Sequence, residues 1–359
     1  MLRLGKLTSR IGSRAGGPTS LTRANGWRSL SANAKVRFGK DNLSNTKAII
    51  TLADGTVLEG ISFGAEKGIT GEVVFTTGMV GYPESLTDPS FRGQIITLTY
   101  PMVGNYGVPR NETDKWGLPR TFESDQIQAA GLIVQDYAET YSHWDAEMSL
   151  SDWLKKEGIP GVHGIDTRML TKKIRATGAI VGKIESGESD GILPVEDPNT
   201  RHLVAEVSRK DVKVYGKGNP HKILAVDCGM KANIIRMLCE RGAEAHVVPY
   251  NFPIDEHLDE YDGVFLSNGP GGPAMCVETI EELKEVISRE GDRIRPLFGI
   301  CLGNQLMGIA AGAETIKLPF GNRGHNQPVI NALNGDCYIT PQNHGFAVED
   351  KTLPKEWEV

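Results

Sequence analysis

The chain has 359 residues, 39% of them hydrophobic, which is enough to bury a substantial core and to form about two domains. Its 42 glycines follow no Gly-X-Y period, which excludes a collagen-like fibre and indicates many tight turns. No run of about 18 apolar residues is present, so the sequence predicts no membrane span. The cysteine count of 5 is odd and includes no C-x-x-C pair, which argues against a disulfide framework and a structural zinc site.

Charge is unevenly distributed along the chain. The net charge is −6, yet residues 1–40 hold nine Lys or Arg and no acid, which leaves 30 basic and 45 acidic residues elsewhere. This Ser- and Arg-rich segment, with Leu4, Leu7 and Ile11 at helical spacing, predicts a mitochondrial transit peptide and a location in the matrix. A nucleic-acid-binding arm and a disordered tail are the alternatives. For the acidic body we expect neither nucleic acid nor a membrane as partner.

Residues 45–195 predict one α+β domain. The stretch "KAIITLADGTVLEGISFG" alternates apolar and polar residues around Asp54 and Gly55, which is typical of a β-hairpin with a tight turn. Further strands are expected at residues 72–76, 94–100 and 130–135.

Two helices and a linker follow these strands. Ser149, with Asp152 three residues later, predicts the start of one helix, and Asp166 or Thr167 predicts the cap of another. The polar, Gly-rich stretch that leads to residues 196–220 shows no sustained periodicity, so we predict a linker there.

Residues 221–359 predict a second domain of another kind. Short apolar runs alternate with helical segments that end at glycine, the pattern of a parallel sheet with helices on both faces. The expected fold class is therefore α/β: an α+β amino-terminal domain followed by a doubly wound, mostly parallel sheet, which we expect to be incomplete at its carboxyl end. Ligands of such sheets bind at the carboxyl ends of the strands, where "SNGPGGP" and "GICLG" lie.

The segment "FGICLGNQL" places Cys301 between Gly299 and Gly303, after an apolar run and before a helix. This spacing is typical of a nucleophile elbow, a turn so sharp that only glycine fits beside the central residue. We expect the helix N-terminus to stabilise a Cys301 thiolate, and the N–H of Leu302 to face an oxyanion. A buried core thiol is the alternative that the pattern alone leaves open.

The loop "LSNGPGGP" can bring bare backbone N–H groups close to a ligand, because it combines several glycines with two stiffening prolines. A crowded turn without a ligand is the alternative. The loop matches neither a Walker loop nor a dinucleotide-binding fingerprint.

Three segments together, "FGICLGNQLMGIAAGAE", "LSNGPGGP" and "TPQNHGFAV", resemble a class I glutamine amidotransferase domain. Two segments of the first domain, "GEVVFTTGMVGYPESLTDPSFRGQIITLTYPMVGNYG" and "GIPGVHGIDTRMLTKKIRATGAIVGKI", resemble the small-subunit amino-terminal domain of carbamoyl-phosphate synthetases. The resemblance extends from about residue 46 to the end of the chain.

The resemblance implies that Cys301 attacks the side-chain amide of glutamine, with the oxyanion held by N–H groups of Leu302 and Gly271. Ammonia would then pass to a synthetase portion, in the same longer chain or in a partner subunit, that uses bicarbonate, ATP and a divalent cation. No cofactor or metal is expected in this segment itself. The implied glutamine contacts are Ser90, Gly269, Gly271, Leu302, Gln305, Asn343, Gly345 and Phe346.

The general base of the family is a histidine in a Phe-His-Pro-Glu segment, which these 359 residues do not contain. His344 matches a position on the substrate side, and the base role for it ranks behind both a pocket role and a structural role. We therefore expect the chain to be a fragment of a longer ligase and to show little or no glutaminase activity alone.

A basic leader on this architecture resembles the mitochondrial, fused form of the family, which would make carbamoyl phosphate for the urea cycle or for arginine synthesis. One alternative is an ammonia-dependent form in which this region only docks and regulates. Another is an α/β hydrolase with a cysteine nucleophile, which would leave the glycine loop and the first domain unexplained.

Overall fold

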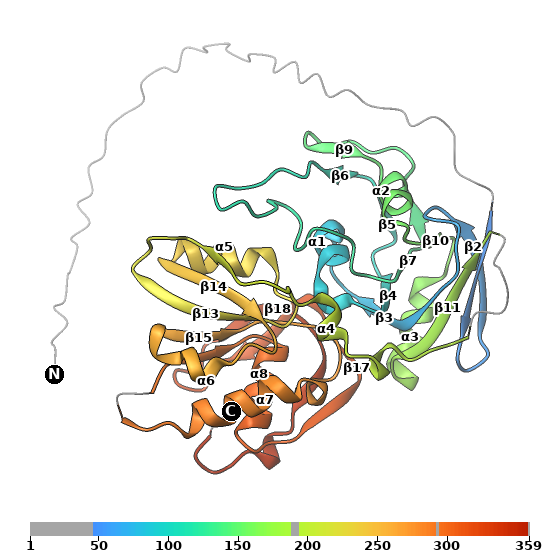
Figure 1. Ribbon diagram of the computed structural model, residues 1–359. Coiled ribbons are helices and arrows are strands. Elements are labelled where there is room, and N and C mark those ends of the chain that lie inside the picture. Colours follow the sequence, from blue (N-terminus) through green and yellow to red (C-terminus); the bar gives the residue numbers. More distant parts are fainter. Residues whose placement is uncertain (1–45, 188–193, 292–293, 358–359) are drawn as a thin grey trace, which may run out of the picture. The chain divides into compact units, whose positions relative to one another are not determined.

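The computed structural model describes residues 46–187, 194–291 and 294–357 (Figure 1). The transit peptide predicted at residues 1–40 lies outside the described residues. The fold class is confirmed: a mixed domain built on a barrel precedes a mostly parallel sheet with helices on both faces.

The barrel begins with the predicted hairpin, strands β1 (Lys47–Leu52) and β2 (Val57–Ser62), which pair antiparallel. Gly55 supplies the positive φ of 85° at their turn. The barrel closes in the order β1-β11-β3-β4-β7-β10-β2. The other strands of this closed sheet are β3 (Ile69–Thr76), β4 (Gln94–Leu98), β7 (Gly131–Ile133), β10 (Gly161–His163) and β11 (Ile180–Ser186). Closure leaves no free edge on this sheet.

Both helices predicted in this region form where their caps indicate. Helix α2 (Leu150–Glu157) begins after Ser149, whose hydroxyl accepts a hydrogen bond from the Asp152 N–H at 3.0 Å. Helix α3 (Thr167–Thr177) is capped by Asp166, since its carboxylate accepts from the Met169 N–H at 2.8 Å. The shorter elements are α1 (Tyr82–Thr87), η1 (Pro89–Phe91), β5 (Met102–Val103), β6 (Val108–Pro109), β8 (Asp136–Tyr137) and β9 (Ala146–Met148).

Alternation along the barrel strands divides their side chains between two hydrophobic clusters. Val73 of β3 packs in a cluster with Leu170 of α3, whereas the next residue, Val74, packs in a cluster with Leu154 of α2. Because successive side chains of a strand point to opposite faces, strands β3, β4 and β7 contribute to both cores.

The predicted linker at residues 196–220 carries defined structure. It contains η2 (Pro198–Thr200), α4 (Leu203–Val207) and β12 (Lys213–Tyr215). Strand β12 pairs antiparallel with β14 (Ala243–Pro249), so this segment adds an edge strand to the second sheet.

The second sheet has the order β12-β14-β13-β15-β16, and all its pairs except β12 with β14 are parallel. Its other strands are β13 (His221–Asp227), β15 (Gly263–Leu266) and β16 (Leu297–Gly299). The helices of this half are α5 (Ala232–Glu240), α6 (Ile254–His257), η3 (Leu258–Glu260), η4 (Pro273–Met275), α7 (Val277–Ser288), α8 (Leu302–Ala310) and η6 (Asp350–Thr352). This is the predicted alternation of strands and helices.

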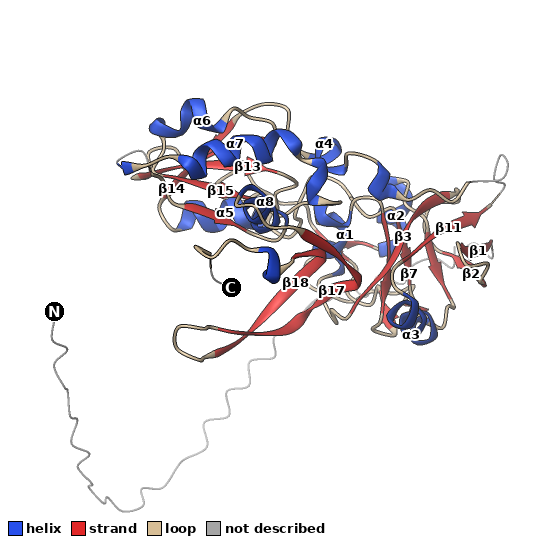
Figure 2. Ribbon diagram, turned by 90° about the horizontal axis from the view of Figure 1, so that it is seen from below, coloured by secondary structure: helices blue, strands red, loops and turns tan. Residues whose placement is uncertain are grey.

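Helices cover both faces of this sheet (Figure 2). Leu224 and Val226 of β13 share a buried cluster with residues of α6, α7 and α8. Ala225, between them in the sequence, packs with Ile235 of α5 on the opposite face. Strand β13 is therefore apolar on both sides, as expected for a central strand of a buried parallel sheet.

A long hairpin of β17 (Thr315–Ile330) and β18 (Cys337–Val348), which the sequence did not predict, joins the two halves. Its Arg323 carbonyl accepts a hydrogen bond from Thr77 N–H, next to β3, at 3.1 Å. Its Phe346 carbonyl accepts from Gln305 Nε2 of α8 at 2.7 Å. The hairpin thus contacts both the barrel and the elements that follow β16.

Candidate active site

Cys301 stands at a strained turn between β16 and α8. Its φ is 53° and its ψ −108°, and among the described residues no other residue except glycine has a positive φ. Such a conformation costs about 1–3 kcal/mol for a residue with a Cβ, and strain of this kind clusters at functional sites. The predicted elbow is present.

The two glycines beside Cys301 are required because the chain folds back on itself. A Cβ on Gly299 would lie 2.5 Å from the carbonyl carbon of Gly303, and a Cβ on Gly303 would lie 2.3 Å from the carbonyl oxygen of Leu266. Both distances are far below van der Waals contact and involve backbone atoms. The pattern G-x-C-x-G therefore reflects backbone crowding, as predicted.

The position of Cys301 contrasts with that of the core thiols. Cys228, Cys239 and Cys276 are buried in hydrophobic clusters, whereas Cys301 is half-buried and lines two cavities. The structure thus favours the interpretation that the Cys301 thiol faces a cavity over the alternative that it is a buried core residue.

The Cys301 thiol donates a hydrogen bond to the carbonyl oxygen of Asn343, with 3.3 Å between sulfur and oxygen. Burial raises the pKa of this thiol to about 11, and the negative charge of Asp88 adds to the rise. The N–H of Leu302 and the cation of Lys231 act in the opposite direction. The expected help from the N–H at the start of the helix is present, but desolvation outweighs it, so the pKa of the thiol lies above its usual value.

His344 lies beside this site with both ring nitrogens engaged. Nδ1 is 2.8 Å from the Phe346 carbonyl oxygen, and Nε2 is 3.0 Å from Oε1 of Gln342. These partners belong to its own strand, so the imidazole braces the hairpin. A general base needs hydrogen-bond reach to the proton that it removes, and the geometry of His344 fits a pocket-wall role instead.

Two cavities meet at Cys301. The smaller, of about 30 Å³, is lined by Cys301 and by seven other predicted site residues: Ser90, Gly269, Gly271, Gln305, Asn343, Gly345 and Phe346. The remaining predicted residue, Leu302, is buried at the start of α8, where its N–H acts on the Cys301 sulfur. The larger cavity, of about 1000 Å³, is also lined by Cys301, Ser90 and Asn343.

Among the predicted site residues, Ser90 comes from the barrel side of these cavities. It lies in η1, and its hydroxyl accepts a hydrogen bond from Asn268 Nδ2 at 2.9 Å. Asn268 directly precedes the glycine loop that follows β15. The structure therefore brings together, around one thiol, predicted residues from segments about 200 positions apart.

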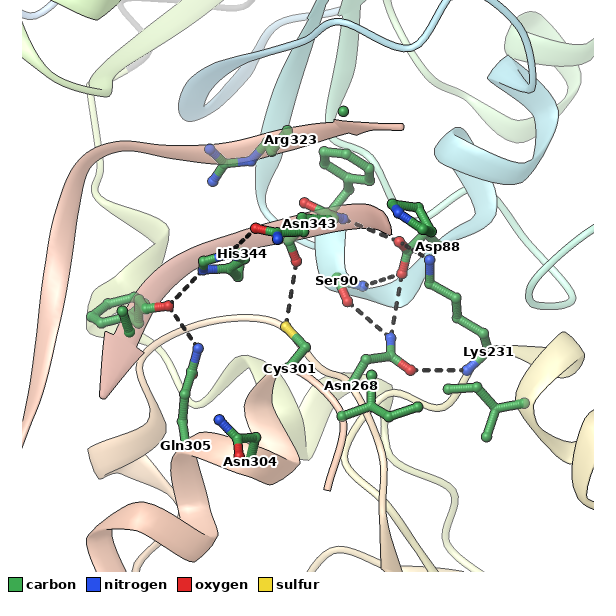
Figure 3. Close-up of a pocket in the computed structure, with 18 of the residues that line it drawn as sticks. Asp88, Ser90, Lys231, Asn268, Cys301, Asn304, Gln305, Arg323, Asn343 and His344 are labelled. Carbon is green, nitrogen blue, oxygen red and sulfur yellow. Dashed lines mark hydrogen bonds and ion pairs between the residues drawn. The ribbon is translucent and has the colours of Figure 1, made fainter. Parts of the chain in front are cut away.

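Asp88, Lys231 and Asn268 form a polar network beside Cys301 that the sequence analysis missed (Figure 3). Asp88 Oδ2 is 2.8 Å from Lys231 Nζ, and Asn268 Oδ1 accepts from the Lys231 N–H at 3.3 Å. Burial alone would lower the pKa of Lys231, but the Asp88 carboxylate raises it overall, so the lysine stays charged. The only sequence signal was the segment "TDPS", in which Asp precedes Pro-Ser as a helix cap.

Glu72, Lys317 and Arg323 form a charged wall of the small cavity, which was also missed. Glu72 Oε1 is 2.8 Å from Lys317 Nζ, and its other oxygen accepts from Gln94 Nε2 at 3.0 Å. Arg323 is only 5% exposed and donates to the Phe320 carbonyl at 2.7 Å. Burial lowers the pKa of its guanidinium, although Glu72 opposes this shift.

No cluster of three or more His, Cys, Asp and Glu side chains suited to a metal ion occurs in the described ranges. The helices in the same part of the chain are all too short or too polar to cross a membrane. The chemistry present at the site is that of a thiol, of backbone N–H groups, and of amide and charged side chains.

This fold and site define a class of protein: a doubly wound α/β protein with a cysteine on a glycine-flanked elbow between a parallel strand and a helix. Comparison with family models identifies the group within it. Residues 50–184 match the carbamoyl-phosphate synthase small chain, CPSase domain, and residues 224–359 match glutamine amidotransferase class-I.

Similar proteins agree with these matches. The chain is 46% identical over 344 residues to the carbamoyl phosphate synthase arginine-specific small chain of Aspergillus oryzae, covering 94% of this chain and 76% of that one. It therefore belongs to the carbamoyl-phosphate synthase small-chain family, with a class-I glutamine amidotransferase domain.

Larger animal proteins contain the same region. The chain is 52% identical over 313 residues to multifunctional protein CAD of Squalus acanthias, covering 87% of this chain and 14% of that protein. It is 47% identical over 342 residues to the mitochondrial carbamoyl-phosphate synthase [ammonia] of Homo sapiens, covering 93% of this chain and 22% of that protein. The chain thus spans about a fifth or less of these animal relatives.

Proposed function

We propose that this chain is the glutamine-hydrolysing part of a carbamoyl-phosphate synthase, with Cys301 as its nucleophile. The observation that carries the proposal is the strained elbow, which presents the thiol to a cavity lined by both halves of the chain. Membership of the small-chain family supports it.

In the proposed reaction the thiolate sulfur attacks the side-chain carbonyl carbon of glutamine, so a carbon–sulfur bond forms and the carbonyl becomes an oxyanion. The N–H groups of Leu302 and Gly271 stabilise this oxyanion. As it collapses, the carbon–nitrogen bond breaks and the nitrogen leaves as ammonia after taking up a proton. Water then cleaves the γ-glutamyl thioester, which releases glutamate and restores the thiol.

The residues around the two cavities that meet at Cys301 supply the proposed contacts to glutamine. Gln305, Asn343 and Ser90 present amide and hydroxyl groups, and the remaining predicted contacts present mainly backbone atoms. Gln305 Nε2 is held by the Phe346 carbonyl at 2.7 Å. Because these groups come from both halves of the chain, the proposed site requires both halves.

Removal of the thiol proton is the step that the described residues do not supply at neutral pH, since the pKa of Cys301 is about 11 and His344 is engaged elsewhere. We therefore expect little or no glutamate release from the 359-residue chain alone at pH 7–8. Steady glutamate release from this chain that Cys301→Ser abolishes would show that a base within it suffices.

The proposed partner is a synthetase portion that consumes ammonia with bicarbonate, ATP and a divalent cation. Its presence is supported by the relatives, in which this region is part of a much longer protein or is a separate small chain. The decisive assay joins the two parts and measures carbamoyl phosphate. We expect Cys301→Ser to abolish synthesis from glutamine and to leave synthesis from ammonia intact.

An ammonia-dependent form is the second candidate, since one group of relatives is described as carbamoyl-phosphate synthase [ammonia], mitochondrial. The same assay separates the two, because an enzyme that ignores glutamine and works with ammonia alone would identify this region as a docking and regulatory part. The retained elbow and cavity favour glutamine use.

We place the protein in the mitochondrial matrix, with carbamoyl phosphate made for the urea cycle or for arginine synthesis. The acid-free basic leader supports the location, and mitochondrial and arginine-specific relatives fit both suggestions. A fluorescent protein fused behind residues 1–45 should accumulate in mitochondria. A diffuse signal would contradict the predicted leader.

A further inference from the structure

The Asp88 carboxylate joins segments that are far apart in the sequence. It is 2% exposed and stands at the start of η1, where Oδ1 accepts the Ser90 N–H at 2.9 Å. Oδ2 is 2.8 Å from Lys231 Nζ and accepts from Asn343 Nδ2 at 3.1 Å. A buried carboxylate with this many donors is held in one position.

Asn343 connects this carboxylate to the thiol (Figure 3). Its side-chain amide donates to Asp88, and its backbone carbonyl accepts the hydrogen bond from Cys301 Sγ at 3.3 Å. Both bonds belong to one residue. A change at Asp88 therefore moves, or frees, the residue against which the Cys301 thiol rests.

The charges around Cys301 come from several elements. Asp88 precedes η1, Lys231 precedes α5, and Arg323 lies on β17; each interacts electrostatically with the thiol. His344 on β18 lines the same cavity as Cys301, with its ring nitrogens bonded within the hairpin, and Glu72 and Lys317 on the cavity wall pair with each other at 2.8 Å. Asp88 is the carboxylate whose charge acts on the thiol, so it opposes a negative charge on the sulfur.

We propose that Asp88 is a positioning residue for Cys301, which fixes the thiol through Asn343 and places a like charge close to the sulfur. The turn that contains Asp88, on the barrel side, thereby affects the position and the ionisation of the Cys301 thiol in the parallel-sheet half. The proposal rests on the proposed function insofar as Cys301 is taken as the nucleophile. Glutamine that enters the cavity lined by Asn343 would disturb this contact and so prepare the thiol for attack.

A purely structural role for Asp88, as the cap of η1, is the alternative. A cap affects stability but has no particular effect on the ionisation of one thiol. The rate at which iodoacetamide alkylates Cys301, followed against pH by peptide mass spectrometry, separates the two roles, because only the thiolate reacts.

The experiment uses the full 359-residue chain and the variants Asp88→Asn, Asp88→Glu and Asp114→Asn. Asp88→Asn removes the like charge, so the midpoint of the pH profile should fall by about one pH unit or more. Asp114→Asn is the matched control: it breaks an ion pair with Arg236, 2.8 Å long, that joins the barrel half to α5 but is not among the charges acting on the thiol. Its midpoint should equal that of the wild type.

Asp88→Glu keeps the charge and displaces the acceptor of Asn343. We expect its midpoint to stay near the wild-type value, while protection of Cys301 by L-glutamine weakens at least about threefold. Labelling of the buried Cys228 and Cys276 reports unfolding in any variant. If Asp88→Asn unfolds, the Asp88→Glu variant decides the question. If L-glutamine then protects Cys301 as well in Asp88→Glu as in the wild type, the proposal is overturned.

The proposal is also overturned if the pH profile of Cys301 alkylation is the same in Asp88→Asn as in the wild type. It is overturned as well if the midpoint shifts equally in Asp114→Asn. Failure of the proposed function is a separate result, since L-glutamine would then fail to protect wild-type Cys301 at all. The pH profiles would still decide whether Asp88 controls the thiol.

Discussion

Two regions hold the Cys301 thiol, and they do so by different physical means. The elbow of β16 and α8 fixes the backbone by crowding, since Cβ atoms at Gly299 or Gly303 would collide with main-chain atoms at 2.5 and 2.3 Å. The Asp88 turn acts through charge and hydrogen bonds that reach the thiol by way of Asn343. A side chain larger than glycine does not fit at the crowded positions of the elbow, whereas a ligand can rearrange the hydrogen bonds of the Asp88 turn.

The difference shows how the work of an active site can be divided. Crowding places Cys301 at the carboxyl end of β16, at the strained φ of 53°. The polar network adds charge and hydrogen bonds around the thiol. Variants that affect one region and leave the other intact therefore test whether the two means are separable.

The largest effect is expected for Gly303→Ala. Its new Cβ would meet the carbonyl oxygen of Leu266 at 2.3 Å, so strand β15 and helix α8 must move apart. We expect a loss of about 2–4 kcal/mol in the free energy of unfolding, measured by urea denaturation. Alkylation of Cys301 should lose its protection by glutamine in the same variant.

Gly272→Ala is the matched control for that change. Gly272 lies in the loop after β15 at φ −82°, and its nearest neighbour for a new Cβ is a side-chain atom of Phe346 at 3.4 Å, an ordinary contact. Its stability should stay within about 0.5 kcal/mol of the wild type. Equal destabilisation of both variants would contradict the crowded elbow.

The variant Lys231→Met removes the cation that pairs with Asp88 beside the thiol. Removal of the positive charge should raise the pKa of Cys301 further above about 11, because Asp88 would then act without its counter-charge. Thiolate is the reactive form, so alkylation of Cys301 at pH 9 should slow about three- to tenfold. Lys173→Met, which removes the partner of Asp54 on the barrel, should leave the rate unchanged.

The smallest effect is expected from relief of strain at Cys301 itself. Glycine adopts positive φ without penalty, whereas alanine keeps the Cβ, so Cys301→Gly should be more stable than Cys301→Ala by about 1 kcal/mol. Thermal unfolding of the two variants measures the difference. Alanine is usually more stabilising than glycine at such positions next to a helix. If Cys301→Ala were more stable than Cys301→Gly, the turn would not be strained.

The elbow could be predicted from the sequence because its cause is local. Gly299, Cys301 and Gly303 lie within five positions, and the apolar run before them and the helix after them are evident from periodicity. The same holds for the capped helices α2 and α3 and for the alternating strands and helices between residues 221 and 310. Short-range rules suffice where neighbours in sequence cause the structure.

The polar network could not be predicted in this way. Asp88 and Asn343 are 255 positions apart, and their contact depends on how the hairpin β17–β18 packs against both halves. Closure of the barrel likewise depends on β1 pairing with β11, which lies more than 120 positions away. The raised pKa of Cys301 could not be predicted for the same reason, because burial and Asp88 are properties of the assembled site.

The central claim is that Cys301 is a glutamine-directed thiol, and protection from alkylation tests it most directly. The 359-residue chain is treated with iodoacetamide with and without L-glutamine, and labelling is measured at Cys301 and at Cys337, which is exposed on the hairpin. We predict that L-glutamine slows labelling of Cys301 in a saturable manner and leaves Cys337 unaffected. Labelling of Cys301 that L-glutamine does not change at any concentration would contradict the account.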